Sequence, residues 1–166
     1  MALAVAGVVV LGALLARETG PATATRSAAS EKGLALAGTD PVTGAEVTLA
    51  QFEGKPVVVN IWASWCPGCY AEAPALARFA EAHPEAGVIG INYQDTRDGA
   101  RDFYERYGWE FPSIFDPRGE IASRLGLQGM PTTIFLDADH REVARIVGET
   151  DEPGFADGLK QATGNT

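Results

Sequence analysis

The chain contains two cysteines, and both lie in the short segment Trp65-Cys66-Pro67-Gly68-Cys69. This Cys-x-x-Cys pair follows a largely apolar run, Val57 to Ile61, which predicts a buried strand. The residues after the pair have the pattern of a helix, so Cys66 is expected at a helix N-terminus. Unpaired backbone N–H groups and the helix dipole stabilise a thiolate at such a position. The two thiols are therefore either redox partners or two ligands of a bound metal.

Pro67 suits the first turn of the predicted helix, where its missing N–H would have no partner. The N–H groups of Gly68 and Cys69 are then free to point at the Cys66 sulfur. We therefore expect Cys66 to be the more exposed nucleophile and Cys69 to lie behind it. The alternative is a buried structural disulfide or two inert thiols, but a pair beside Trp65 at a strand-to-helix corner favours a presented redox site.

The order of the other elements predicts an α/β fold with a mixed central sheet. Besides a hairpin within residues 39–49, strands are expected at residues 57–63, 88–92, 113–115, 132–136 and 142–147. Helices are expected at residues 67–83, 98–107 and 120–125, with a last one from about residue 151. Strands that alternate with helices, followed by a hairpin and a terminal helix, indicate a sheet covered on both faces.

The N-terminal residues differ in composition from the rest of the chain. Residues 2–16 form an uncharged apolar run, which as a helix would span about 23 Å of a roughly 30 Å membrane core. We expect residues 1–19 to be a signal peptide or membrane anchor, residues 20–37 a flexible linker and residues 38–166 one folded domain outside the cytoplasm. Because no Lys or Arg precedes the apolar run, the true start is expected upstream of Met1.

The net charge of −9 limits the kinds of partner that the domain can bind. A strongly acidic domain is a poor ligand for nucleic acids and for anionic membranes. We therefore expect no nucleic-acid partner, and we expect the domain to act as a monomer.

Several motifs together resemble the thioredoxin-like superfamily, and within it the TlpA, ResA and CcmG (DsbE) branch of membrane-associated thiol-disulfide oxidoreductases. The resemblance is carried by Gly54 to Cys69, Glu72-Ala73-Pro74, Gly90 to Tyr93 and Gly129 to Thr133. It implies a thioredoxin fold with an N-terminal hairpin and an insertion between the central strand-helix units. It also implies a redox-active cysteine pair that works without a metal or another cofactor.

The resemblance gives the residues around the pair expected roles. Met130-Pro131 matches a cis-proline that faces the disulfide, leaves a backbone edge open to a substrate strand and keeps metals off the thiols. Pro74 matches a proline that kinks the active-site helix, and Trp65 is expected to shape the docking surface.

Two polar residues distinguish this chain from cytoplasmic thioredoxin. Asn60 stands where thioredoxin has a buried Asp, and the branch commonly has an acidic residue near the second cysteine instead. Glu72, one helical turn after Cys69, is therefore expected to accept the Cys69 proton. The alternative is a solvated Glu favoured by the helix dipole.

The predicted activity is the reduction of protein disulfides, in which Cys66 attacks and Cys69 resolves the mixed disulfide. A nearby carboxylate opposes thiolate formation, which favours a reducing dithiol. The resemblance implies a membrane thiol reductant as electron donor, and apocytochrome c as substrate in cytochrome c maturation. Two alternatives stay open: a disulfide-forming oxidase on the same fold, and a copper-binding chaperone that uses both thiolates.

Overall fold

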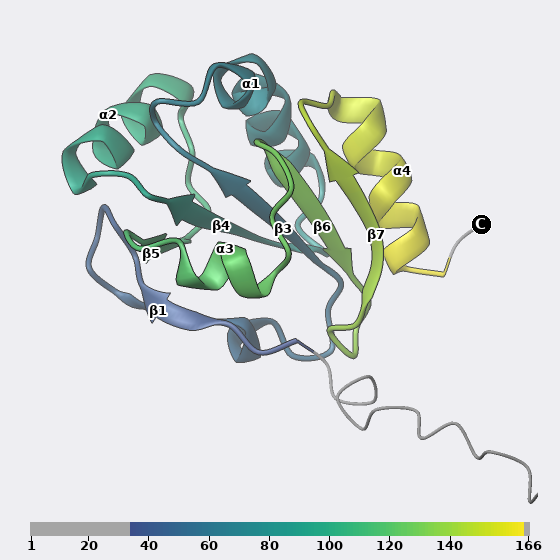
Figure 1. Cartoon of the computed structure of the whole chain (residues 1–166). Helices are drawn as coiled ribbons and strands as arrows, with labels where there is room; N and C mark the ends of the chain where they lie inside the picture. Colours follow the sequence, from purple (N-terminus) through teal and green to yellow (C-terminus); the bar gives the residue numbers. More distant parts are fainter. Residues whose placement is uncertain (1–33, 165–166) are drawn as a thin grey trace, which may run out of the picture.

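The computed structural model describes residues 34–164 and has a five-stranded mixed sheet at its centre (Figure 1). The strands cross the sheet in the order β5-β4-β3-β6-β7. Their bounds are β3 Val57–Trp62, β4 Gly87–Tyr93, β5 Ser113–Asp116, β6 Thr132–Leu136 and β7 Glu142–Val147. Strands β3, β4 and β5 are parallel, whereas β6 runs antiparallel to both β3 and β7. The predicted mixed sheet is confirmed.

Helices cover both faces of this sheet, as predicted (Figure 1). Residues of α1 (Pro67–Ala82), α2 (Arg97–Tyr107) and α4 (Glu152–Ala162) share one apolar core. The core on the opposite face includes residues of α3 (Glu120–Arg124) and of the N-terminal segment. That segment holds the hairpin strands β1 (Ala37–Thr39) and β2 (Glu46–Thr48) and a 3-10 turn, η2 (Leu49–Phe52), which the sequence analysis did not predict.

The central strand β3 explains why there are two cores. All six of its residues are buried, and their side chains alternate between the faces of the sheet. Val57, Val59 and Ile61 belong to the core beneath α3. Val58 and Trp62 belong to the core beneath α1. Strand β3 is therefore covered on both sides. The cysteine segment follows its carboxyl end and so lies at one edge of the sheet.

Trp62, the last residue of β3, has a fully buried side chain. Its ring packs against Phe103 and Trp109, with centroid distances of 4.7 and 5.0 Å. Its Nε1 donates a hydrogen bond of 3.0 Å to Ser113 Oγ. A side chain at Gly90 would collide with both Trp62 and Ser113, so this close approach requires glycine. The packing fixes the end of β3 immediately before the cysteines.

The folded part of the chain begins before the predicted domain boundary at residue 38. The backbone N–H of Leu34 donates to the carbonyl of His140 at 2.8 Å, and Leu36 is buried in the core. The predicted leader, residues 1–19, and most of the predicted linker, residues 20–37, lie outside the described residues. Within residues 34–164, no helix has the length and apolar character needed to cross a membrane.

Candidate active site around the Cys66–Cys69 disulfide

Cys66 and Cys69 form a disulfide at the junction of β3 and α1, with their Cα atoms 5.2 Å apart. Cys66 is the N-cap of α1, and its sulfur accepts a hydrogen bond of 3.2 Å from the Cys69 N–H. Pro67 is the first residue of the helix, as predicted. When the disulfide opens, the same helix N-terminus stabilises negative charge on the Cys66 sulfur.

The exposure of the cysteines differs less than the sequence analysis predicted. In the disulfide form Cys66 is 3% exposed and Cys69 is 1% exposed. Cys66 is thus the more accessible sulfur, but only slightly, because both cysteines are part of the core beneath α1. The Gly68 N–H, also expected to point at the Cys66 sulfur, makes no such hydrogen bond among the described residues.

The Met130–Pro131 peptide bond is cis, as the resemblance implies. Pro131 is buried and faces the cysteine segment: a Cβ atom built on Gly68 would lie 2.9 Å from Pro131 Cδ. Met130 is half-buried and packs against the core that contains both cysteines. The structure therefore brings Met130 and Pro131, which are more than sixty residues away along the chain, to the disulfide.

Glu72 is 1% exposed and lies on α1 one turn after Cys69. Its Oε1 accepts a hydrogen bond of 2.7 Å from Asn60 Nδ2, and its Oε2 accepts one of 3.2 Å from the Thr150 N–H. Asn60 Nδ2 also donates to Thr133 Oγ1 at 3.0 Å. The alternative of a solvated Glu72 is therefore wrong, and the two polar residues that distinguish this chain from thioredoxin are in direct contact.

The environment of Glu72 raises the pKa of its carboxyl group to near neutral pH. Burial raises the pKa of the Glu72 carboxyl to about 7, although the hydrogen bonds from Asn60 and Thr150 act in the opposite direction. The negative charge of Glu149 raises this pKa further. A carboxyl group with a pKa near the working pH is well suited to accept and return a proton.

Trp65 is 52% exposed beside the disulfide, and its Nε1 donates to the carbonyl of Gln94 at 3.1 Å. Asp95, the next residue, accepts hydrogen bonds from the Ser64 N–H at 2.6 Å and from the Ser64 hydroxyl at 2.7 Å. Two residues after β4 therefore hold the loop that leads into the cysteine pair. Gln94 and Asp95 were not predicted as site residues, although the carboxyl ends of neighbouring parallel strands meet at one edge of a sheet.

Pro74 lies within α1, and the helix continues to Ala82. Because proline has no N–H, the Tyr70 carbonyl lacks its usual partner four residues later in the helix. The Tyr70 hydroxyl donates to the Ser64 carbonyl, which ties this part of α1 to the loop before the cysteines. A kink at Pro74 stays a prediction.

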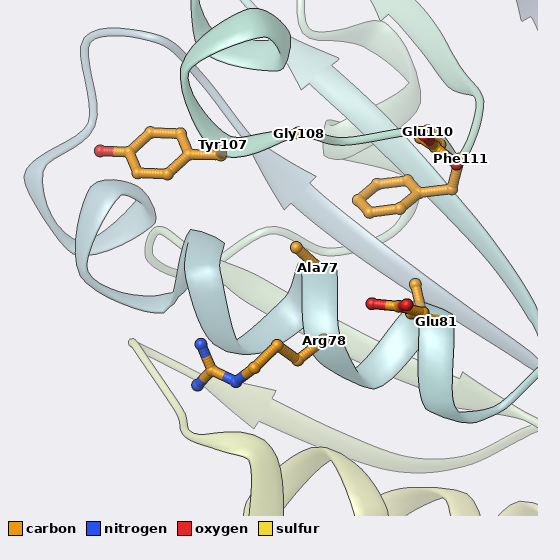
Figure 2. A pocket seen from close by; sticks show the side chains of 8 residues that line it. Ala77, Arg78, Glu81, Tyr107, Gly108, Glu110 and Phe111 are labelled. Atoms are coloured by element: carbon orange, nitrogen blue, oxygen red, sulfur yellow. The ribbon is translucent and has the colours of Figure 1, made fainter.

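A separate hollow of about 470 Å³ lies between α1 and the turn after α2 (Figure 2). Ala77, Arg78 and Glu81 of α1 line one side, and Tyr107 and Phe111 lie on the other. The hollow contains none of the residues of the cysteine segment, and it has no part in the chemistry considered below. Within residues 34–164, no group of three or more His, Cys, Asp or Glu side chains is placed to hold a metal ion.

The reversible chemistry available at this site is thiol-disulfide exchange, since the cysteine pair closes at a helix N-terminus opposite a cis-proline. Such a site on a mixed sheet defines the class of thioredoxin-like thiol-disulfide redox proteins. Comparison with known proteins agrees. The chain belongs to the Redoxin family, whose model matches residues 21–160, and within it to the thiol-disulfide oxidoreductases of the DsbE and ResA type.

Relatives of known sequence support this placement. The chain is 36% identical over 109 residues to the thiol:disulfide interchange protein DsbE of Vibrio cholerae. This alignment covers 65% of this chain and 58% of that protein. It is 30% identical over 122 residues to the thiol-disulfide oxidoreductase ResA of Bacillus thuringiensis, with 72% of this chain and 70% of ResA covered. It is 31% identical to the soluble secreted antigen MPT53 of Mycobacterium bovis over 80% of this chain and 76% of that protein.

Solved structures confirm the thioredoxin-like fold. A DsbF homologue from Corynebacterium diphtheriae superposes with a TM-score of 0.72 at 31% identity, covering 78% of this chain and 85% of that one. A secreted thiol-disulfide isomerase from Corynebacterium glutamicum superposes with a TM-score of 0.68 at 34% identity, covering 75% and 80% of the two chains.

Proposed function

We propose that this protein reduces disulfide bonds in other proteins outside the cytoplasm, using Cys66 and Cys69 as a dithiol. The observation that carries the direction of the reaction is the buried Glu72, hydrogen-bonded to Asn60 one turn after Cys69. A carboxylate beside a dithiol opposes thiolate formation. Strongly oxidising proteins of this kind owe their potential to a stabilised reduced form. A site that does not stabilise the thiolate of the reduced form in this way favours reduction of the substrate.

The reaction begins when the Cys66 thiolate attacks one sulfur of the substrate disulfide. A mixed disulfide forms, and the other substrate sulfur leaves as a thiolate that takes up a proton. Glu72 then accepts the Cys69 proton, and the Cys69 sulfur attacks Cys66. The bond between Cys66 and the substrate breaks, and the second substrate thiolate leaves. Two electrons have passed from the protein to the substrate, and a separate thiol reductant restores the dithiol.

The proposed location rests on the apolar run at residues 2–16 and on two relatives whose names describe them as secreted. A signal peptide and a membrane anchor within residues 1–19 are both compatible with this location. The part of the predicted linker that precedes Leu34 would then connect this segment to the folded domain.

The proposed partners follow from the similarity to the DsbE and ResA type. The substrate that we propose is apocytochrome c, so the protein would serve cytochrome c maturation. A membrane thiol reductant would supply the electrons, and the domain would act as a monomer.

Trapping of the mixed disulfide tests this function. In a Cys69→Ser variant, the second attack cannot occur, so substrates should remain attached to Cys66. Mass spectrometry of the trapped adducts should identify extracytoplasmic proteins, apocytochromes c among them. Adducts that never include an apocytochrome would rule out the cytochrome role, and the complete absence of adducts would rule out the reductase function.

A further inference from the structure

Glu149 lies directly over the cysteine segment, although it is eighty residues away along the chain. It follows β7 after Gly148, whose φ of +97° turns the chain toward α1. A Cβ atom built on Gly68 would lie 3.2 Å from Glu149 Oε2, and 2.9 Å from Pro131 Cδ. The carboxylate therefore lies beside the cis-proline and above Gly68, one of the two residues that separate the cysteines.

No basic side chain within the part of the chain that the structure describes forms an ion pair with Glu149. Glu149 is exposed, and among residues 34–164 it takes part in no salt bridge. Arg78 of α1 and Arg145 of β7 are paired with other carboxylates: Arg78 pairs with Glu152 at 2.9 Å, and Arg145 pairs with Glu142 at 2.7 Å. The charge acts on the redox site itself, since it contributes to the raised pKa of Glu72.

Ala71, Thr150 and the exposed Asp151 line a shallow hollow together with Glu149. Val147, two residues before Glu149, is 50% exposed, and Trp65 of the cysteine segment is 52% exposed. Val147 lies next to the loop of the cis-proline, because its Cγ1 is 3.2 Å from a Cβ atom built on Gly129. A substrate segment that docks at the disulfide thus meets exposed apolar side chains and the carboxylate of Glu149, which lies over Gly68.

We propose that Glu149 is a specificity-determining residue that favours substrates with Lys or Arg next to the cysteine being reduced. The inference rests on the proposed reductase function and adds a substrate class to it. In the mixed disulfide, the substrate segment covers Gly68 and Pro131, so the side chain beside the substrate cysteine comes within reach of Glu149. A basic side chain there pairs with the carboxylate, whereas an acidic one is repelled.

The test uses the reduced full chain and three peptide disulfides that differ only in having Lys, Gln or Glu next to the cysteine. For each peptide, the second-order rate constant for its reduction by the protein is measured in a single turnover. This constant is divided by the rate constant for reduction of the same peptide by dithiothreitol, which corrects for differences in the intrinsic reactivity of the three disulfides. At low salt, Lys should exceed Gln by about three-fold and Gln should exceed Glu by about three-fold, as for an exposed ion pair.

Two variants separate this role from a structural one. Glu149→Gln should reduce the spread between the Lys and Glu peptides to less than about 1.5-fold, and Glu149→Lys should reverse their order. Glu53→Gln, which makes the same charge change at an exposed position after η2, should keep the native order. The ratios do not depend on the folded fraction, since all three peptides are compared in one preparation.

The outcomes are distinguishable. A native order that persists in Glu149→Gln and Glu149→Lys overturns the inference about Glu149 and leaves the reductase function intact. If the reduced protein reduces none of the three peptides, the proposed function itself fails and the inference fails with it.

Discussion

The Glu72 carboxylate accepts a hydrogen bond of 2.7 Å from the Asn60 side chain, and both residues are buried. Asn60 belongs to the central strand and Glu72 to the active-site helix, so this bond joins the two elements that position the disulfide. Because the amide of Asn60 carries no charge, it cannot compensate the burial of the carboxylate fully. The raised pKa of Glu72 follows from this incomplete compensation.

Replacement of Glu72 by Gln should slow the resolution of the mixed disulfide. The variant has no group to accept the Cys69 proton, and the loss of a general base slows such a step by about 100-fold. Rapid-quench analysis should therefore show the Cys66 mixed disulfide accumulating in Glu72→Gln. Glu81→Gln, a matched change at an exposed position of α1, should resolve it at the native rate. Equal rates in both variants would remove Glu72 from the mechanism.

The raised pKa of Glu72 also predicts how stability depends on pH. The native state holds the Glu72 proton up to a pKa of about 7, whereas the ordinary pKa of a glutamate in an unfolded chain is 4.5. The native state therefore binds more protons in this interval, and the free energy of unfolding falls as the pH rises from about 4.5 through about 7. The decrease due to Glu72 should reach at most about 3 kcal/mol. Denaturant unfolding of the oxidised protein and of Glu72→Gln should show this decrease in the first and not in the second.

Replacement of Asn60 by Asp should raise the apparent pKa of the carboxyl pair. Two carboxylates at the distance of the present hydrogen bond cannot both ionise readily in a buried site. The pH at which resolution is half-maximal should move upward by about one unit or more. A pH–rate profile that coincides with that of the native protein would mean that Asn60 does not control the ionisation of Glu72.

The Asp95 carboxylate should stabilise the loop before the cysteines. In Asp95→Ala, the Ser64 N–H and hydroxyl lose their acceptors, which should destabilise the protein by about 2 kcal/mol. The neighbouring Trp65 indole, bonded to Gln94, should then change its fluorescence. Asp98→Ala, at an exposed position of α2, is the control and should change the free energy of unfolding by less than about 0.5 kcal/mol. Equal stability of the two variants would contradict this role for Asp95.

Most of the fold could be predicted from the sequence because its signals are local. The apolar run of β3, the helical periodicity after Pro67 and the turn residues between β6 and β7 each predict one element. The resemblance around Cys66 and Pro131 then supplied the arrangement of these elements. The short turn η2 was missed because four residues carry too weak a pattern.

The parts of the site that could not be predicted depend on contacts between distant segments. Glu149, Asp95 and Thr150 lie in loops, and their positions follow from the order of strands in the sheet rather than from a local motif. The burial of Cys66 was underestimated for the same reason, since it results from the packing of the whole core beneath α1.

The reduction potential of the Cys66–Cys69 pair tests the central claim most directly. It can be measured by equilibrating the protein with defined ratios of oxidised and reduced glutathione or dithiothreitol and quantifying the free thiols. The buried Glu72 predicts a reducing potential, closer to the value of about −270 mV of thioredoxin than to the value of about −120 mV of DsbA. A potential near −120 mV would contradict the account and would identify the protein as a disulfide-forming oxidase.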